Sequence, residues 1–131
     1  MLDGAAIDRL LDEARRTIGR RVSAAELDAL LADGRMLVVD MRPVEQRSRD
    51  GELPGAVAID RNVLEWRLDA TSAHRIPAAD DPTRPVVLVC NEGYASSLAA
   101  ATLRSLGRTD VTDVDGGYQA WIEFRTTRTS G

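Results

Sequence analysis

Three short apolar runs and a fourth, partly polar one recur along the chain, and helix-like segments lie between them. The runs cover residues 36–39, 56–59, 86–89 and 111–114. Their length and their content of β-branched residues are typical of buried strands. Helical spacing or helix-end signals occur in residues 5–18, 23–34, 62–68, 95–106 and 118–124. Strands that alternate with helices predict an α/β fold, in which a mostly parallel central sheet of about four to five strands carries helices on both faces.

A chain of 131 residues is long enough for one domain with its own core and too short for two ordinary ones. The first predicted helix is an addition to that domain, and we expect it to pack there through an apolar stripe. The stripe consists of Ile7, Leu10, Leu11, Ala14 and Ile18. We therefore divide the chain into an N-terminal helical extension (1–19), one α/β domain (20–125) and a polar tail (126–131).

Charge and hydropathy exclude several classes of function. All 17 basic residues are arginines, which excludes Schiff-base chemistry on a lysine and, with abundant alanine, points to a GC-rich bacterial source. The formal net charge of −4 gives no electrostatic reason to expect nucleic acid or an anionic membrane as a partner. No apolar run approaches the roughly 20 residues of a membrane span, and the N-terminus lacks the pattern of a signal peptide. A cytoplasmic location is therefore expected.

Cys90 is the only cysteine and His74 the only histidine. A single cysteine excludes an internal disulfide, and without a Cys/His cluster there is no structural zinc site. We expect neither a metal nor a cofactor. A catalytic triad would have to use His74, which lies in a Pro- and Asp-rich stretch predicted to be a loop.

Cys90 lies where the predicted strand 86–89 ends and a loop leads into the helix 95–106. In parallel α/β sheets the site lies beyond the carboxyl ends of the strands, and Asp40 falls at such an end as well. The unpaired N–H groups of a helix N-terminus would stabilise a thiolate, a persulfide or a bound oxyanion at Cys90. Gly93 would let the loop backbone turn inward. The alternative is that Cys90 is an inert core residue at the end of an apolar strand.

Three sequence elements occur in order along the chain. The first is Asp-Met-Arg (40–42) with Glu45 and Gly-Glu-Leu-Pro-Gly-Ala (51–56), the second is Val-Val-Leu-Val-Cys (86–90) with Gly93 and Ser96, and the third is Val-Asp-Gly-Gly-Tyr-Gln-Ala-Trp (114–121). Over about residues 20–124, these elements resemble those of the rhodanese family of sulfurtransferases. The resemblance implies a rhodanese-like fold of the single-domain type.

The resemblance also implies a mechanism. The Cys90 thiolate would attack the sulfane sulfur of a small donor, hold it as a persulfide and pass it to a nucleophilic acceptor. Because the chain has no second cysteine, the persulfide cannot be resolved as an internal disulfide, and turnover requires an external acceptor. We expect a small thiol in this role, and a protein sulfur acceptor is a further candidate.

Candidate site residues follow from the same resemblance. Cys90 is the catalytic candidate, and the substrate-binding candidates are Asn91, Glu92, Gly93, Tyr94, Ala95, Ser96, Arg42 and Arg61. Asp40 and Glu45 are expected to tie loops together near the site. The loop carries Glu92 and no arginine, and like charge disfavours the dianion thiosulfate as the physiological donor. Arg42 and Arg61 would restore positive charge, unless they are surface residues or structural partners of Asp40 and Glu65.

Two other functions are considered. A phosphatase or arsenate reductase would need an arginine in a Cys-x5-Arg loop to clamp an oxyanion, and the loop after Cys90 has none. A non-catalytic binding or regulatory module is the second alternative, because a fold alone does not establish chemistry.

Overall fold

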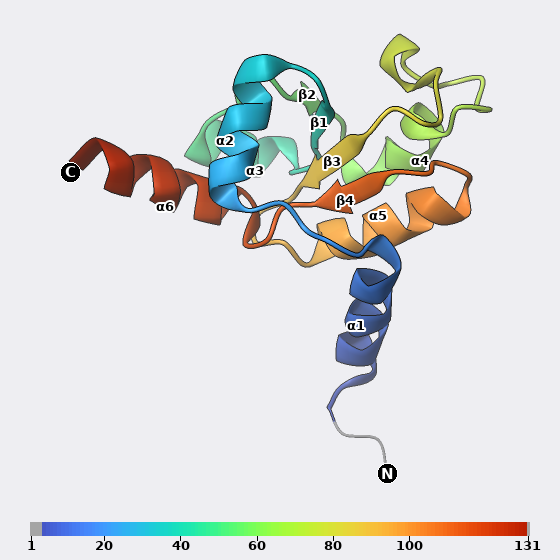
Figure 1. The fold of residues 1–131 in the computed structure, drawn as a ribbon, viewed down its shortest axis with the longest axis horizontal. Coiled ribbons are helices and arrows are strands. Elements are labelled where there is room, and N and C mark those ends of the chain that lie inside the picture. Colours follow the sequence, from blue (N-terminus) through green and yellow to red (C-terminus); the bar gives the residue numbers. More distant parts are fainter. Residues whose placement is uncertain (1–3, 131) are drawn as a thin grey trace.

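A computed structural model describes residues 4–130, and its centre is a four-stranded parallel sheet (Figure 1). The strands are β1 (Leu37–Asp40), β2 (Val57–Ala58), β3 (Val86–Val89) and β4 (Val111–Asp113), and their order in the sheet is β2-β1-β3-β4. The predicted α/β fold with a parallel sheet is thus confirmed, and the strand count lies within the expected four to five.

The helices of the structure follow the predicted alternation with one addition. They are α1 (Ala6–Ile18), α2 (Ala24–Asp33), α3 (Val44–Asp50), α4 (Leu64–Leu68), α5 (Ala95–Ser105) and α6 (Gly117–Ser130), with single 3-10 turns at Arg61–Val63 and Pro77–Ala79. Helix α3 was not predicted. It buries none of its residues, so it has no apolar periodicity that the sequence could have revealed.

Helices cover both faces of the sheet, as strand β3 illustrates. Its alternate residues Val86 and Leu88, together with Cys90, belong to the core under α4 and α5. Val87 and Val89 point to the opposite face and join the core under α2 and α6. Because side chains alternate along a strand, Cys90 emerges on the same face as α5, the helix that follows it.

Strand order places a crevice next to Cys90. Strand β1 lies between β2 and β3, so the chain leaves β1 for one side of the sheet and later returns to its other side. Asp40 at the end of β1 is in register with Val89 at the end of β3. Parallel α/β sheets bind ligands at such a switch point, beyond the carboxyl ends of the strands.

Helix α1 is ordered, but only part of its predicted stripe is buried. Ala14 and Ile18 pack against the domain, whereas Ile7 and Leu10 are more than half exposed. The reason is geometric. The C-terminal half of α1 lies against α5, and no other described element lies beside its first turns, which project away from the domain (Figure 1).

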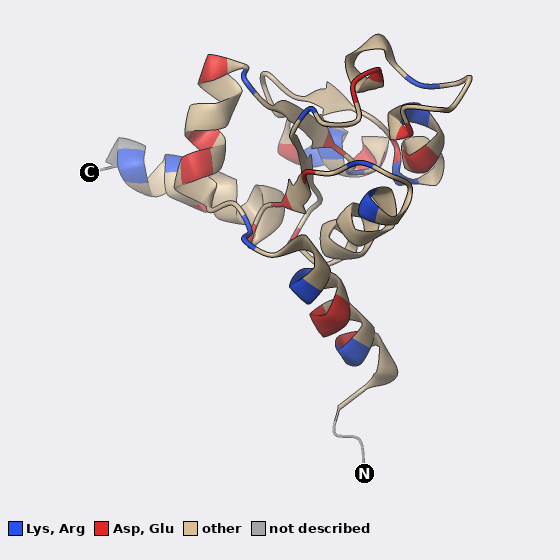
Figure 2. Ribbon diagram, turned by 45° about the vertical axis from the view of Figure 1, so that its right-hand side comes forward, with Lys and Arg blue, Asp and Glu red and all other residues tan. Residues whose placement is uncertain are grey.

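Helix α6 is longer than the sequence suggested. It was expected to end at Phe124 before a polar tail, but it continues to Ser130. Arg125 and Arg128 place guanidinium nitrogens 2.9 and 3.4 Å from the carboxylate of Asp28 in α2, and Figure 2 shows this basic end of α6 beside the acidic α2. These ion pairs stabilise the helical conformation of a segment whose threonines have low helix propensity.

The predicted loop 69–85 is held by one buried arginine. The Arg108 guanidinium donates to the carbonyl oxygens of Leu68, Ala79, Asp81 and Arg84 at 2.9 to 3.2 Å. Burial lowers the pKa of Arg108 below its ordinary value, although the negative charge of Asp81 acts in the opposite direction. Four backbone acceptors on one cation fix this segment, whose only regular structure between 69 and 85 is the 3-10 turn Pro77–Ala79.

Candidate active site

Cys90 is the first residue after β3, and its Sγ atom is held by the loop that follows. The residue is 8% exposed. The backbone N–H groups of Gly93 and Ser96 donate to Sγ at 3.2 and 3.4 Å. The loop leads directly into α5, an 11-residue helix beginning at Ala95. Sγ therefore lies at the positive end of a helix dipole and accepts two amide hydrogen bonds, an arrangement that favours the thiolate or a persulfide.

Several other amides of the loop remain unpaired. Within the described part of the chain, the N–H groups of Asn91, Glu92, Tyr94 and Ala95 have no acceptor. Successive N–H groups on a tight loop form a concave site for anionic atoms. The loop around Sγ is thus built to accept a second sulfur or an oxyanion.

The first turn of α6 supports the loop from below. The N–H groups of Tyr118 and Gln119 donate to the carbonyl oxygens of Cys90 and Asn91 at 2.9 and 3.0 Å. A Cβ atom on Gly117, whose φ is +61°, would lie 2.5 Å from the Cys90 carbonyl oxygen. A glycine is therefore required at this position for the two segments to approach.

A buried polar network lies behind Cys90. Its Sγ is 3.1 Å from Oγ of Ser96, and this hydroxyl donates to the Asp113 carboxylate at 2.7 Å. The Ser97 hydroxyl donates to the same carboxylate oxygen at 2.7 Å. The Arg21 guanidinium pairs with Asp113 through two hydrogen bonds of 2.7 and 3.0 Å. Ser96, Ser97 and Asp113 are fully buried, so the Arg21 charge is needed to compensate the carboxylate.

The surroundings of Arg21 stabilise its positive charge. Burial alone would lower its pKa, but the hydrogen bonds and charge of Asp113, together with the charges of Asp115 and Cys90, raise the pKa above its ordinary value. A positive charge therefore lies behind Cys90, where it offsets the negative charge of the Asp113 carboxylate.

An open pocket of about 360 Å³ gives access to Cys90. It is lined by Met41, Arg42, Pro43, Gln46, Arg61, Cys90, Asn91, Glu92, Tyr94 and Ala95. Seven of the predicted site residues thus meet at one pocket. The other two, Gly93 and Ser96, are buried behind Sγ and contact it through their N–H groups.

The arginines at the pocket are both engaged. The Arg42 side chain has no exposed surface, its guanidinium binds the Asp40 carboxylate and the Gly51 carbonyl at 2.7 to 3.2 Å, and it lies 3.6 Å from the centroid of the Tyr118 ring. Arg61 pairs with Glu65 at 2.8 Å. These contacts match the structural alternative considered from the sequence better than a role in substrate binding.

Asp40 and Glu45, both expected to tie loops together, differ in their contacts. Asp40 accepts hydrogen bonds from the backbone N–H and the guanidinium of Arg42, so it braces the turn after β1. Glu45 lies in the first turn of α3, exposed to solvent, and its side chain pairs with no other residue between 4 and 130. The structure gives Glu45 no bracing contact, because α3 turns it outward.

Four residues near the site were not recognised from the sequence: Arg15, Arg21, Ser97 and Asp113. Arg15 and Arg21 reach the loop from segments more than 70 positions away. Asp113 did carry a signal, since a carboxylate inside the predicted buried strand 111–114 must have buried partners.

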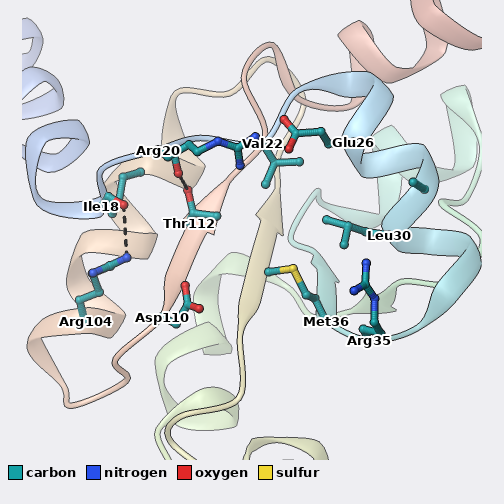
Figure 3. Close-up of a pocket in the computed structure, with 11 residues that line it drawn as sticks. Ile18, Arg20, Val22, Glu26, Leu30, Arg35, Met36, Arg104, Asp110 and Thr112 are labelled. Atoms are coloured by element: carbon teal, nitrogen blue, oxygen red, sulfur yellow. Dashed lines mark hydrogen bonds and ion pairs between the residues drawn. The ribbon is translucent and has the colours of Figure 1, made fainter.

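A larger cavity of about 500 Å³ lies elsewhere, between β4, α2 and the segment that follows α1 (Figure 3). Its charged groups are mostly committed to other residues: Arg20 pairs with Glu26, and Arg104 donates to the carbonyl oxygens of Ile18 and Val111. The lining contains no cysteine or histidine. This cavity therefore lacks the chemistry found at Cys90.

The described residues 4–130 contain no group of three or more His, Cys, Asp or Glu residues placed to hold a metal ion. None of their helices combines the length and hydrophobicity needed to cross a membrane.

A lone cysteine held at a helix N-terminus, at the switch point of a parallel sheet, defines a class of α/β proteins with a thiolate loop. The particular family follows from comparison with known sequences. Residues 23–124 match the rhodanese-like domain, and the chain belongs to this family.

Two curated relatives are named as sulfurtransferases. Human thiosulfate:glutathione sulfurtransferase is 34% identical over 107 residues, which span 78% of this chain and 92% of the relative. The thiosulfate sulfurtransferase GlpE of Pseudomonas savastanoi pv. phaseolicola is 32% identical over 102 residues, which span 78% of this chain and 86% of the relative. These similarities support a rhodanese-type sulfurtransferase.

Solved structures agree with the fold. The human single-domain sulfurtransferase TSTD1 superimposes with a TM-score of 0.65 at 31% identity, covering 80% of this chain and 96% of the other. A protein of unknown function from Rhodopseudomonas palustris, described as a possible tyrosine phosphatase, reaches a TM-score of 0.83 at 30% identity and covers 95% of each chain.

Proposed function

We propose that this protein transfers sulfane sulfur from a small donor to a thiol acceptor through a persulfide on Cys90. The observation that carries the proposal is the position of Sγ, which accepts hydrogen bonds from the N–H groups of Gly93 and Ser96 at the base of an open pocket. The unpaired amides around it supply donors for a second sulfur atom.

The first half-reaction loads the cysteine. The Cys90 thiolate attacks the outer sulfur of the donor, and a new S–S bond forms. The bond between that sulfur and the rest of the donor breaks, and its electron pair leaves with the remainder, such as sulfite from thiosulfate. The loaded state is Cys90 with one additional sulfur, and no redox cofactor is required.

The second half-reaction returns the enzyme to its starting state. The thiolate of an external acceptor attacks the outer sulfur of the persulfide, the S–S bond to Cys90 breaks, and the electron pair returns to Sγ as a thiolate. The acceptor leaves as a persulfide. Since the sequence has only one cysteine, an internal thiol cannot compete for the sulfur.

The charges at the pocket favour a donor with less negative charge than thiosulfate. Arg42 is bound to Asp40 and has no exposed side-chain surface, and Arg61 is paired with Glu65, so a carboxylate already balances the charge of each guanidinium. Glu92 lines the pocket and is exposed. We propose an organic persulfide or a similar thiol-derived donor, because like charge at Glu92 opposes an approaching dianion.

Phosphatase chemistry fits the loop less well. A Cys-x5-Arg loop needs its guanidinium at position 96, to clamp the transferred oxyanion. Ser96 occupies that position, is buried and bonds to Asp113. A non-catalytic binding module remains as an alternative, and the test below separates it from an enzyme.

The test is intact mass spectrometry of the protein after exposure to thiosulfate, glutathione persulfide or mercaptopyruvate. We expect a gain of about 32 Da, the mass of one sulfur atom, that disappears when a thiol is added. Cys90→Ser is the matched control and should fold normally and gain nothing. A wild-type protein that gains no sulfur from any of the three donors would contradict the proposal and favour a binding module.

A further inference from the structure

Arg15 of helix α1 reaches the active-site loop from outside. Its guanidinium donates to the Gly93 carbonyl oxygen at 2.8 Å and to the Ser97 hydroxyl at 3.2 Å. It also lies 5.6 Å from the centroid of the Tyr94 ring. One side chain of the N-terminal helix thus contacts three residues of the segment that follows Cys90.

The Gly93 carbonyl is held unusually firmly. It accepts a second hydrogen bond of 2.8 Å from the Arg21 guanidinium, so two cations share one backbone oxygen. Hydrogen bonds from charged donors are about twice as strong as neutral ones. This carbonyl is therefore fixed toward the two guanidinium groups.

The direction of that carbonyl determines where the next amide points. The described chain contains no cis peptide bond, and in a trans peptide the C=O and the following N–H point in opposite directions. With the Gly93 oxygen drawn toward the Arg15 and Arg21 guanidinium groups, the Tyr94 N–H points away from them. That N–H has no acceptor among residues 4–130 and adjoins the loop amides that face Sγ.

We infer that Arg15 is a positioning residue for the sulfur-carrying loop, and that helix α1 is for this reason a working part of the active site. Both Arg15 and Arg21 precede residues 23–124, the segment that matches the family. The family domain therefore receives its loop support from a segment outside the match. The inference rests on the proposed function, because it concerns the same cysteine.

A purely structural role for Arg15 is the competing explanation, in which the residue only attaches α1 to the domain. Arg104 provides a matched control for that role. It also ties the N-terminal segment to the domain, through a hydrogen bond of 3.2 Å to the Ile18 carbonyl (Figure 3). Unlike Arg15, it makes no hydrogen bond to the loop that surrounds Sγ.

The experiment compares Arg15→Gln, Arg15→Lys and Arg104→Gln in the full chain. Thermal unfolding measures attachment, and the rate of Cys90 alkylation by iodoacetamide between pH 5 and pH 9 measures the availability of the thiolate. We expect both glutamine variants to lower Tm by a few degrees. Only Arg15→Gln should slow alkylation at neutral pH, by about fivefold, because only this change removes hydrogen bonds to the Gly93 carbonyl and the Ser97 hydroxyl.

Sulfur-transfer kinetics provide the second measurement. Arg15→Gln should reduce kcat by about fivefold with a smaller change in KM, since the pocket walls stay in place while the loop amides are misplaced. Arg15→Lys should recover part of the loss, because an ammonium group can still donate to the Gly93 carbonyl but lacks the planar fork that also reaches Ser97. The Arg104 variant should stay within twofold of the wild type.

Two results would overturn the inference. One is an Arg15→Gln protein whose alkylation rate equals that of the wild type. The other is an equal loss in the Arg15 and Arg104 variants, which would trace the effect to attachment of the helix. Alkylation does not depend on sulfur transfer, so it tests the role of Arg15 even if no donor loads Cys90, an outcome that would contradict the proposed function alone.

Discussion

Replacement of Asp113 by asparagine tests the buried network behind Cys90 with a change of almost no volume. The carboxylate accepts four hydrogen bonds, two from Arg21 and one each from Ser96 and Ser97, and it is fully buried. An amide in its place has only one acceptor oxygen. If the amide oxygen faces the two serines, the amide NH2 group meets N–H groups of Arg21. In the reverse orientation, the NH2 group meets the Ser96 and Ser97 hydroxyls, and both hydroxyls must turn.

The magnitude follows from the loss of the counter-charge. Removal of one partner of a buried ion pair costs about 3–5 kcal/mol. Arg21 is 15% exposed at its side chain and keeps hydrogen bonds to Asp115 and the Gly93 carbonyl, so we expect the lower end of this range, about 3 kcal/mol. Since a domain of this size is stable by about 5–15 kcal/mol, the variant should still fold, with a Tm lower by about 10 °C.

Urea denaturation of Asp113→Asn, Arg21→Met and the double variant measures the interaction directly. The double variant should lose at least about 1 kcal/mol less stability than the sum of the two single variants, because removal of either partner already breaks the pair. Additive losses would refute the reasoning and show that Asp113 is held by the serines alone. A loss below about 1 kcal/mol for Asp113→Asn would refute the magnitude.

Two further predictions concern the pocket and the loop that precedes β3. Glu92→Gln should raise kcat/KM for thiosulfate by several-fold to about tenfold, because the Glu92 carboxylate repels a dianion, and should change kcat/KM for an uncharged donor much less. Steady-state kinetics with both donors measure the two effects. Equal effects on both donors would exclude charge repulsion. Arg108→Met should lower the free energy of unfolding by about 3 kcal/mol, because four carbonyl oxygens lose their donor. Urea denaturation measures this loss, with the exposed Arg35→Met as control. A loss equal to that of the control would contradict the prediction.

The central architecture was predictable because the signals for it are local. Strands β1, β2 and β3 lie in short apolar runs, and β1, β3 and β4 are buried along their whole length. The capping box of α2, in which Ser23 and Glu26 bond reciprocally, was visible as a spacing in the sequence. Helix α3 lacks such a signal because it lies on the surface, and the length of α6 depends on Asp28, a residue about 100 positions away.

Only the part of the site that is contiguous with Cys90 in the sequence was predictable. The residues that follow Cys90 are contiguous with it, so the strand, the loop and the helix start were sufficient to place them. The supporting residues behind the loop come from α1, the segment after it and β4. Only the parallel order of β3 and β4 and the crossing of α1 over α5 bring these segments together, and neither is encoded by any local pattern.

The contact between α6 and the loop has a consequence for how the protein is made. The carbonyl oxygens of Cys90 and Asn91 are held by N–H groups of Tyr118 and Gln119, and the buried carboxylate behind them belongs to Asp113. A ribosome synthesises the chain from its N-terminus, so Cys90 is translated well before the residues that complete its surroundings. On a nascent chain that ends before β4, the loop after Cys90 lacks these supporting contacts, and it acquires them only once residues 111–119 have left the ribosome.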